Sequence, residues 1–132
     1  MTREDIRLAV FQTAESQEAP TWMIFRQVEI ESNFNNAAVS ATVALGICQI
    51  LPSTAAEPGY GVEPITEDQI LDPVQATRFL CRYLDALRVH VGGGKWSQAL
   101  LHYNVGPAGD VATASSTYRA LAAYVAEALV ES

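Results

Sequence analysis

Apolar residues recur at intervals of three and four along several stretches of the chain, and this spacing predicts amphipathic α-helices. We expect a first helix over residues 2–16, because Thr2 is followed three residues later by Asp5 in a helix-start pattern. A second helix is expected over residues 19–32, with Pro20 at or near its first turn. The first quarter of the chain is therefore predicted to be helical.

The clearest helical pattern follows Asp72, whose side chain is placed to cap a helix that begins at Pro73. Its apolar repeat consists of Thr77, Leu80, Leu84, Leu87 and Val91. Glycines at 92–94 end it, and a short helix over 96–103 is expected before a turn at 104–107. The last predicted helix carries Tyr118, Leu121, Ala122, Val125 and Leu129.

The middle of the chain has weaker signals. We expect a short helix over residues 44–51 that ends at Pro52, then a turn over 53–56, a breaker cluster at 58–61 and a loop to about Glu67. No alternating strand of useful length, internal repeat or low-complexity segment is present. The predicted fold class is therefore all-α or nearly so.

The composition suits one domain. The chain has 132 residues, 49% of them hydrophobic, which is enough for a self-supporting core over residues 1–132. Eight basic and 15 acidic residues give a net charge of −7, so nucleic acid and anionic membranes are unfavourable partners. Cys48 and Cys81 form no disulfide framework, and neither has metal-ligand spacing to His90 or His102. We expect free, buried thiols, no metal and no cofactor.

Two stretches, residues 32–56 and 96–109, contain no charged residue. The first is too rich in Asn, Gln and Pro for a membrane-spanning helix, and we expect no stable membrane insertion. Near the N-terminus, Arg7 and Gln12 interrupt the apolar core that a secretory signal needs, so we expect no signal peptide. Polar but uncharged stretches indicate a surface that is buried or meets a neutral ligand.

Two carboxylates, Glu29 and Glu31, lie near the end of the second predicted helix. Residues two apart on a helix point about 200° away from each other, so the two cannot form one catalytic pair. Both have apolar neighbours on the helix, and the helical pattern does not choose between them. Without further information, each is best interpreted as a solvated helix charge.

Four motifs around and after Glu31 resemble the lytic transglycosylase (soluble-lytic-transglycosylase-like) family of the lysozyme superfamily. They are Glu31-Ser32-Asn33-Phe34-Asn35 followed by Ser40, the run from Gly46 to Ala55, Leu71-Asp72-Pro73, and Tyr103-Asn104-Val105-Gly106-Pro107. Tyr124 resembles the family's final tyrosine, although the Glu-Thr-Arg that often precedes it is missing. The motifs occur in the family's order and cover residues 20–129, nearly the whole chain.

The resemblance implies a lysozyme-like helical domain with a substrate cleft that cleaves peptidoglycan between N-acetylmuramic acid and N-acetylglucosamine. By resemblance, Glu31 is the single catalytic acid and base, Gln49, Tyr103 and Asn104 line the sugar subsites, and Ser40 contacts the substrate's amide groups; Tyr124 is a further substrate-binding candidate. The implied reaction is assisted by the substrate and leaves a 1,6-anhydromuramic end, so no second carboxylate is required.

The sequence departs from the family at Asn36, where Pro is common, at Val43, where Gly is usual, and at Cys48, where Met is usual. These departures affect the expected shape of the cleft more than the reaction. One alternative is a goose-type lysozyme-like muramidase, in which water replaces the sugar hydroxyl. The other is a non-catalytic cell-wall-binding or virion structural module. The resemblance implies glycan strands as the partner and action on the bacterial cell wall. It extends to phage virion or lysis proteins, and a domain of a larger protein is equally compatible. The sequence does not identify protein partners.

Overall fold

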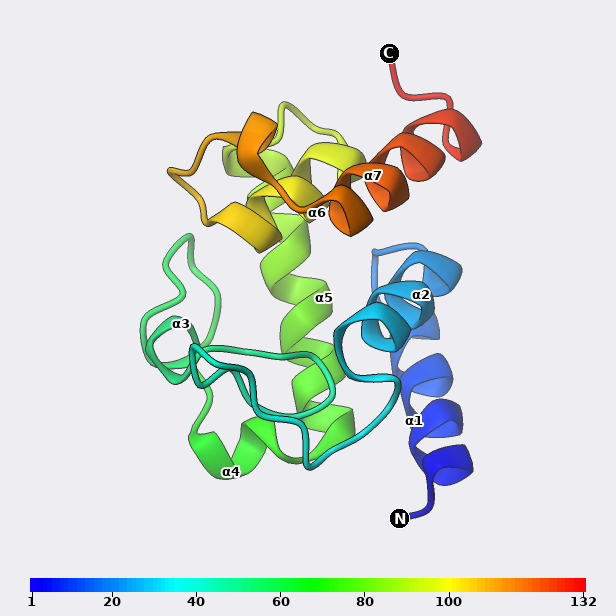
Figure 1. Cartoon of the computed structure of the whole chain (residues 1–132), viewed down its shortest axis with the longest axis vertical. Helices are drawn as coiled ribbons and strands as arrows, with labels where there is room; N and C mark the ends of the chain where they lie inside the picture. Colours follow the sequence, from blue (N-terminus) through cyan, green and yellow to red (C-terminus); the bar gives the residue numbers. More distant parts are fainter. The chain divides into compact units, whose positions relative to one another are not determined.

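Seven α-helices and one short 3-10 helix make up the regular structure of the computed structural model, which describes Met1 to Ser132 (Figure 1). No strand is formed, so the predicted all-α class is confirmed. The residues group into two compact units, Met1–Arg82 and Tyr83–Ser132, with the boundary inside the longest helix. None of the helices combines the length and apolarity needed to cross a bilayer.

The first unit begins with the two predicted helices, α1 (Arg3–Glu15) and α2 (Thr21–Ser32). Thr2 and Asp5 form a reciprocal capping box at the start of α1, as the sequence predicts. The two helices pack against each other and bury apolar residues of both (Figure 1). The buried residues from these helices include Ile6, Val10, Met23, Ile24 and Val28. This packing fixes the direction in which α2 ends.

The predicted helix over residues 44–51 is wrong. The chain there makes tight turns joined by isolated antiparallel bridges, Val39 to Leu45 and Leu45 to Ile50. Gly46 has a φ of 73° and Gln49 a φ of 52°, and such left-handed residues cannot occur in a right-handed helix. A Cβ at Gly46 would also lie 3.0 Å from the carbonyl oxygen of Ile70. Gly46 therefore allows both the turn and a close approach of two chain segments.

Two short helices follow. α3 (Pro52–Ala56) has Pro52 in its first turn and occupies the stretch for which a turn was predicted. α4 (Glu67–Ile70) was not predicted, although Thr66 and Gln69 form a capping box that the sequence contains. Four residues are too few to show a helical repeat, which explains why the pattern alone missed α4.

α5 (Pro73–His90) is the predicted long helix. Asp72 accepts hydrogen bonds from the backbone N–H of Val74 and the side-chain amide of Gln75, each at 3.0 Å, which confirms its predicted capping role.

In the second unit, α6 (Trp96–Val105), the 3-10 helix η1 (Val111–Thr113) and α7 (Ser116–Ala128) follow, and α6 packs against both α7 and η1.

Candidate active site

Glu31 lies on the last turn of α2 and is half-buried. Its neighbour Cys48 is completely buried. Burial raises the pKa of the Cys48 thiol, and the nearby Cys81 thiol and Glu31 carboxylate raise it further, while a hydrogen bond with Thr77 opposes the rise. The end of α2 thus brings the candidate carboxylate beside the segment that carries Cys48 and Gln49.

Glu29, by contrast, is engaged on the helix surface. Its carboxylate forms an ion pair with the guanidinium of Arg26, three residues earlier, and its side chain is 40% exposed. This is the arrangement of an ordinary solvated helix charge. The helical pattern did not choose between the two glutamates, and the structure shows that Glu29 is a surface charge paired with Arg26.

Ser32, the residue after Glu31, ties the end of α2 to the segment bearing Gln49. Its hydroxyl donates a hydrogen bond to the carbonyl oxygen of Ile47 at 2.7 Å. Ile47 is buried, so without this donor its carbonyl oxygen would lose a partner in the interior. Ser32 was not among the predicted site residues, although it directly follows Glu31 in the motif.

The turn after α2 is held by cations stacked on aromatic rings. Phe34 is buried with a φ of 61°, an unusual conformation for a bulky residue. The guanidinium groups of Arg3 and Arg7 lie 5.6 and 5.5 Å from the centre of its ring, and Arg7 also lies 5.4 Å from the ring of Phe25. Arg3 also donates hydrogen bonds to the carbonyl and side-chain oxygens of Asn33. These contacts fix where the chain leaves α2.

The side-chain amide of Gln49 holds its own loop. Its nitrogen donates to the carbonyl oxygens of Ala38, at 3.1 Å, and Gly46, at 2.9 Å. Because carbonyl oxygens only accept hydrogen bonds, these partners assign the amide orientation. The Oε1 atom of the half-buried Gln49 is left to accept from another molecule. Gln49 is therefore both a clamp for the loop and a possible acceptor site.

Ser40 closes a tight hairpin rather than pointing freely outward. Its hydroxyl accepts from the backbone N–H of Ala44 at 3.0 Å and lies 3.0 Å from the hydroxyl of Thr42. The three-residue loop between Ser40 and Ala44 ends with Val43 at a φ of 64°. A left-handed residue at this place is typical of such hairpins and is normally Gly, which gives a physical meaning to the departure at Val43.

Asn36, the departure from Pro, links two loops. Its side-chain amide donates to the carbonyl oxygen of Leu71 at 2.6 Å, while its buried Oδ1 atom has no hydrogen-bond partner. A Pro could not make this bond, so Asn36 secures the loop by a contact instead of by backbone rigidity.

The other candidates, Tyr103, Asn104 and Tyr124, lie in the second unit. Tyr103 is half-buried between two tyrosine rings, with Tyr83 edge-on at 6.1 Å and Tyr118 stacked at 6.5 Å. Sequence reasoning gave Tyr83 no role and placed Tyr118 only in an apolar repeat. Both are buried, and they fix the position of the Tyr103 ring.

Asn104 is exposed, and its Oδ1 atom accepts from the backbone N–H of Ser115 at 2.8 Å, which leaves its amide nitrogen available. Like Gln49, it uses one end of its amide to hold a loop. Tyr124 lies on α7 and is 64% exposed. No group of three or more His, Cys, Asp or Glu residues is arranged to hold a metal ion.

The sequence model of the family described as "Transglycosylase SLT domain" matches residues 9–126. Among solved structures, the chain is similar to the lytic transglycosylase Slt of Pseudomonas aeruginosa, determined as an inactive Glu→Gln mutant, with a TM-score of 0.67 and 19% sequence identity. The similarity covers 94% of this chain and 24% of that one, so this chain spans about a quarter of the length of Slt. The fold is therefore that of the lytic transglycosylase.

Proposed function

Since the chain belongs to the Transglycosylase SLT domain family, we propose that it is a lytic transglycosylase that cleaves the bond between N-acetylmuramic acid and N-acetylglucosamine in peptidoglycan. The observation that carries the assignment of the acid is the environment of Glu31. Glu31 lies on the last turn of α2 near the buried Cys48, whereas Glu29 is paired with Arg26 at the surface. The structural relative named above was inactivated by a single Glu→Gln change, which supports a glutamate in this role.

In the proposed reaction, the protonated Glu31 donates its proton to the glycosidic oxygen as the bond from that oxygen to C1 of the muramic residue breaks. The N-acetyl oxygen of the same residue attacks C1 and stabilises the positive charge. Glu31 is half-buried and lies near the buried Cys48, so its carboxyl group is partly shielded from solvent where the proton transfer is proposed.

Glu31, now a carboxylate, then accepts the proton of the muramic C6 hydroxyl. At the same time the C6 oxygen bonds to C1 and displaces the N-acetyl oxygen. The product is a 1,6-anhydro ring, and Glu31 is protonated again. No water is consumed, and no second carboxylate is needed to activate one. The residues from Ser32 to Ala56, which follow Glu31 and form the adjoining turns, contain neither Asp nor Glu.

Sugar binding is proposed to use neutral groups. Gln49 offers an acceptor oxygen, Asn104 offers donor hydrogens, and the ring of Tyr103 is held by its neighbours. Hydroxyl and acetamido groups can pair with these side chains without the cost of burying a charge. Ser40 and Tyr124 are proposed as further residues that contact the substrate.

Mass spectrometry of the fragments released from purified sacculi tests this function. We expect muropeptides with 1,6-anhydro ends, which are lighter than hydrolytic products by one water. A majority of reducing ends would indicate a goose-type lysozyme-like muramidase instead. Release of no fragments by folded protein would indicate a wall-binding module.

The substrate places the action of the chain at the bacterial cell wall. We propose a phage virion or lysis protein as the finer assignment, on the resemblance of its motifs alone. Proteomic detection of the chain in purified phage particles, or in lysing cells before release of progeny, tests this assignment; its absence from both would contradict it.

A further inference from the structure

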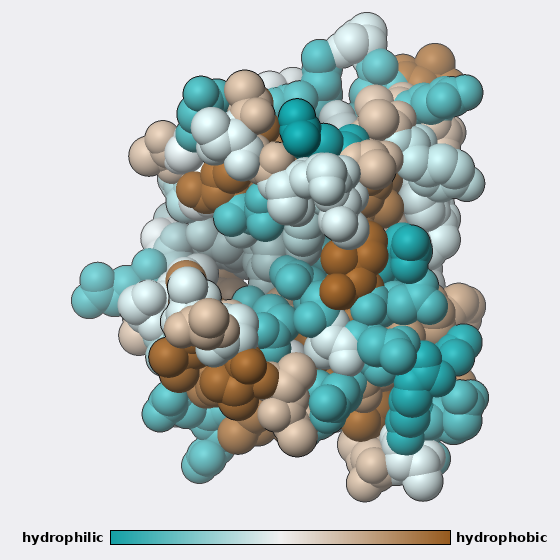
Figure 2. Space-filling model, in the orientation of Figure 1, coloured by the Kyte–Doolittle hydropathy of each residue, from teal (hydrophilic) through white to brown (hydrophobic).

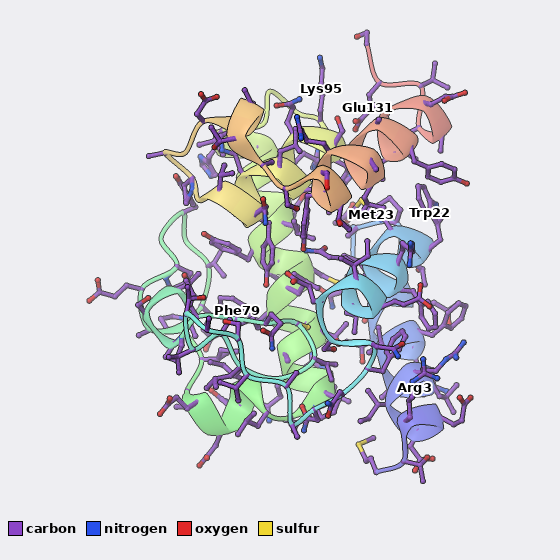
Figure 3. All side chains as sticks on the ribbon, in the orientation of Figure 1. Arg3, Trp22, Met23, Phe79, Lys95 and Glu131 are labelled. Atoms are coloured by element: carbon purple, nitrogen blue, oxygen red, sulfur yellow. The ribbon has the colours of Figure 1, made fainter.

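A pocket of about 170 Å³ lies in the first unit, between α5 and the chain around α4. Its lining comes from the loop residues 63–65, from Gln69 of α4 and from one face of α5. The α5 residues are Gln75, Arg78, Phe79 and Arg82. Phe79, labelled in Figure 3, lies on the side of α5 toward the segment that carries α3. A water molecule takes about 30 Å³ in the liquid, so the pocket holds several heavy atoms.

Arg78 and Arg82 provide the positive charge of the pocket lining. Neither guanidinium forms an ion pair or a hydrogen bond within the protein, although Arg78 lies close enough to the Asp72 carboxylate to help lower its pKa. Arg3, Arg7, Arg26 and Arg88, by contrast, all pair with acidic side chains. Two cations without an ion pair therefore line one pocket of a chain whose net charge is −7. Glu63 is the only acidic residue of the lining, so the pocket carries a positive formal charge.

The remaining polar groups complete a site for a carboxylate. Gln69 uses its Oε1 atom to accept from the backbone N–H of Thr66, which leaves its amide hydrogens available. Arginine presents paired N–H groups that match the two oxygens of a carboxylate. The buried ring of Phe79 adds an apolar wall for the carbon atoms next to such a group.

The pocket is separate from the candidate active site. Arg78 and Arg82 are four residues apart and share one face of α5, while Thr77 and Cys81, next to Cys48, occupy a different face. A helix is about 10–12 Å across with its side chains, and an extended peptide spans about 3.3–3.6 Å per residue. Adjacent helix residues lie about 100° apart, so the path around α5 from the face of Thr77 and Cys81 to that of Arg78 and Arg82 is about 9–10 Å. An extended peptide of three or four residues spans about that distance.

We propose that this pocket binds a carboxylate of the peptide stem carried by the glycan strand, and that it makes the protein prefer peptide-bearing over peptide-free strands. The proposal rests on the proposed function, since peptidoglycan is the substrate that carries both glycan and peptide. The hydroxyl and acetamido groups of the glycan are neutral, so the charged partner of Arg78 and Arg82 comes from the peptide.

The test compares kcat/KM on peptide-bearing strands with kcat/KM on strands stripped of their peptides by an amidase. For the double variant Arg78→Gln/Arg82→Gln, we expect a loss of about three- to tenfold on peptide-bearing strands and no change on stripped strands. Glu63→Gln removes the one negative charge of the lining and should increase activity on peptide-bearing strands only. Arg119→Gln, which removes a charge from α7 outside the pocket, is the matched control.

Calorimetric titration with the peptide released by the amidase gives a readout that does not need catalysis. We expect weaker binding in the double variant and tighter binding in Glu63→Gln, with unfolding midpoints near that of the wild type. Equal losses of the double variant on both kinds of strand, or unchanged peptide binding in both variants, would overturn the pocket assignment. A wild type that binds the peptide but cleaves neither strand would overturn the proposed function alone.

Discussion

At Val43, a β-branched side chain occupies a left-handed conformation with a φ of 64°. Such a residue is strained by about 1–2 kcal/mol, and its exposed side chain regains little by burial. We predict that Val43→Gly raises the free energy of unfolding by up to about 1 kcal/mol, because the relief of strain exceeds the entropy cost of glycine. Urea denaturation at neutral pH measures the change.

Val39 provides the matched control for this prediction. It is similarly exposed, at 61% against 56% for Val43, but it has no positive φ. Val39→Gly should therefore destabilise the protein. If both substitutions lower the free energy of unfolding, the strain at Val43 is not relieved by glycine and the interpretation of the hairpin is wrong.

Gln49 is predicted to depend on its two donated hydrogen bonds. Gln49→Glu keeps the size and the acceptor oxygens but places a carboxylate against the carbonyl oxygens of Ala38 and Gly46. We expect a loss of about 1–3 kcal/mol in the free energy of unfolding, together with lower activity, because the donors are removed from a part-buried site. A variant as stable and active as the wild type would show that the two hydrogen bonds donated by the amide nitrogen do not stabilise the loop.

The sequence alone could not decide between Glu29 and Glu31. The positions of Glu29 and Glu31 on a helix gave both of them apolar neighbours, and only the family motif favoured Glu31. The pairing of Glu29 with Arg26 follows from a spacing of three residues and was readable in advance. The pocket of Arg78 and Arg82 was not, because its other wall comes from a loop without a repeat.

α6 is capped from a distant part of the chain. Its N-cap residue Lys95 provides no side-chain hydrogen bond, and the carboxylate of Glu131 accepts from the backbone N–H groups of Trp96 and Ser97 instead (Figure 3). We predict that Glu131→Ala lowers the free energy of unfolding by about 0.5–2 kcal/mol, the usual range for a lost cap. Glu127→Ala, in the last turn of α7, is the control and should have little effect in the same thermal scan; equal losses would exclude a capping role.

α5 has a cap that depends on pH. The hydrogen bond from Gln75 and those from the backbone lower the pKa of Asp72 below its ordinary value, against the effect of burial. Because the folded pKa is lower than the unfolded one, the stabilisation is present above about pH 4 and is lost as the pH falls through the folded pKa. Asp72→Ala should thus cost about 0.5–2 kcal/mol at pH 7 and progressively less below pH 4. Denaturation curves across this pH range measure the difference, and a constant difference would contradict the cap.

The elements that the sequence predicts best are those with apolar repeats, α1, α2, α5 and α7. The short helix expected over 96–103 is also present as α6, but it extends to Val105, into the stretch for which a turn was predicted. The segment 44–51 failed because its buried residues Ile47, Cys48 and Ile50 have spacings that also fit a helix. Its path is set by residues in the left-handed conformation, and the side chains of Val43 and Gln49 do not predict a positive φ. In this segment tertiary contacts override local preference.

The surface formed by the turns after α2 fits a neutral substrate. Figure 2 shows hydrophobic surface among the turns that follow α2, and the exposed apolar residues of this region include Val39, Val43 and Leu51. No charged side chain occurs from Ser32 to Ala56.

The two cysteines are buried and free, and burial raises the pKa of Cys81 to about 12, so neither is suited to thiol chemistry.

The proposed reaction depends most directly on Glu31, and it is tested by the rate at which purified sacculi release soluble fragments with wild type, Glu31→Gln and Glu29→Gln. Glutamine keeps the size of the side chain but cannot cycle a proton. We predict that Glu31→Gln lowers the rate by about 10²–10⁴ with an unchanged circular dichroism spectrum, while Glu29→Gln keeps nearly the full rate. Full activity in a folded Glu31→Gln protein, or loss of activity in Glu29→Gln instead, would contradict the assignment of Glu31 as the catalytic acid and base.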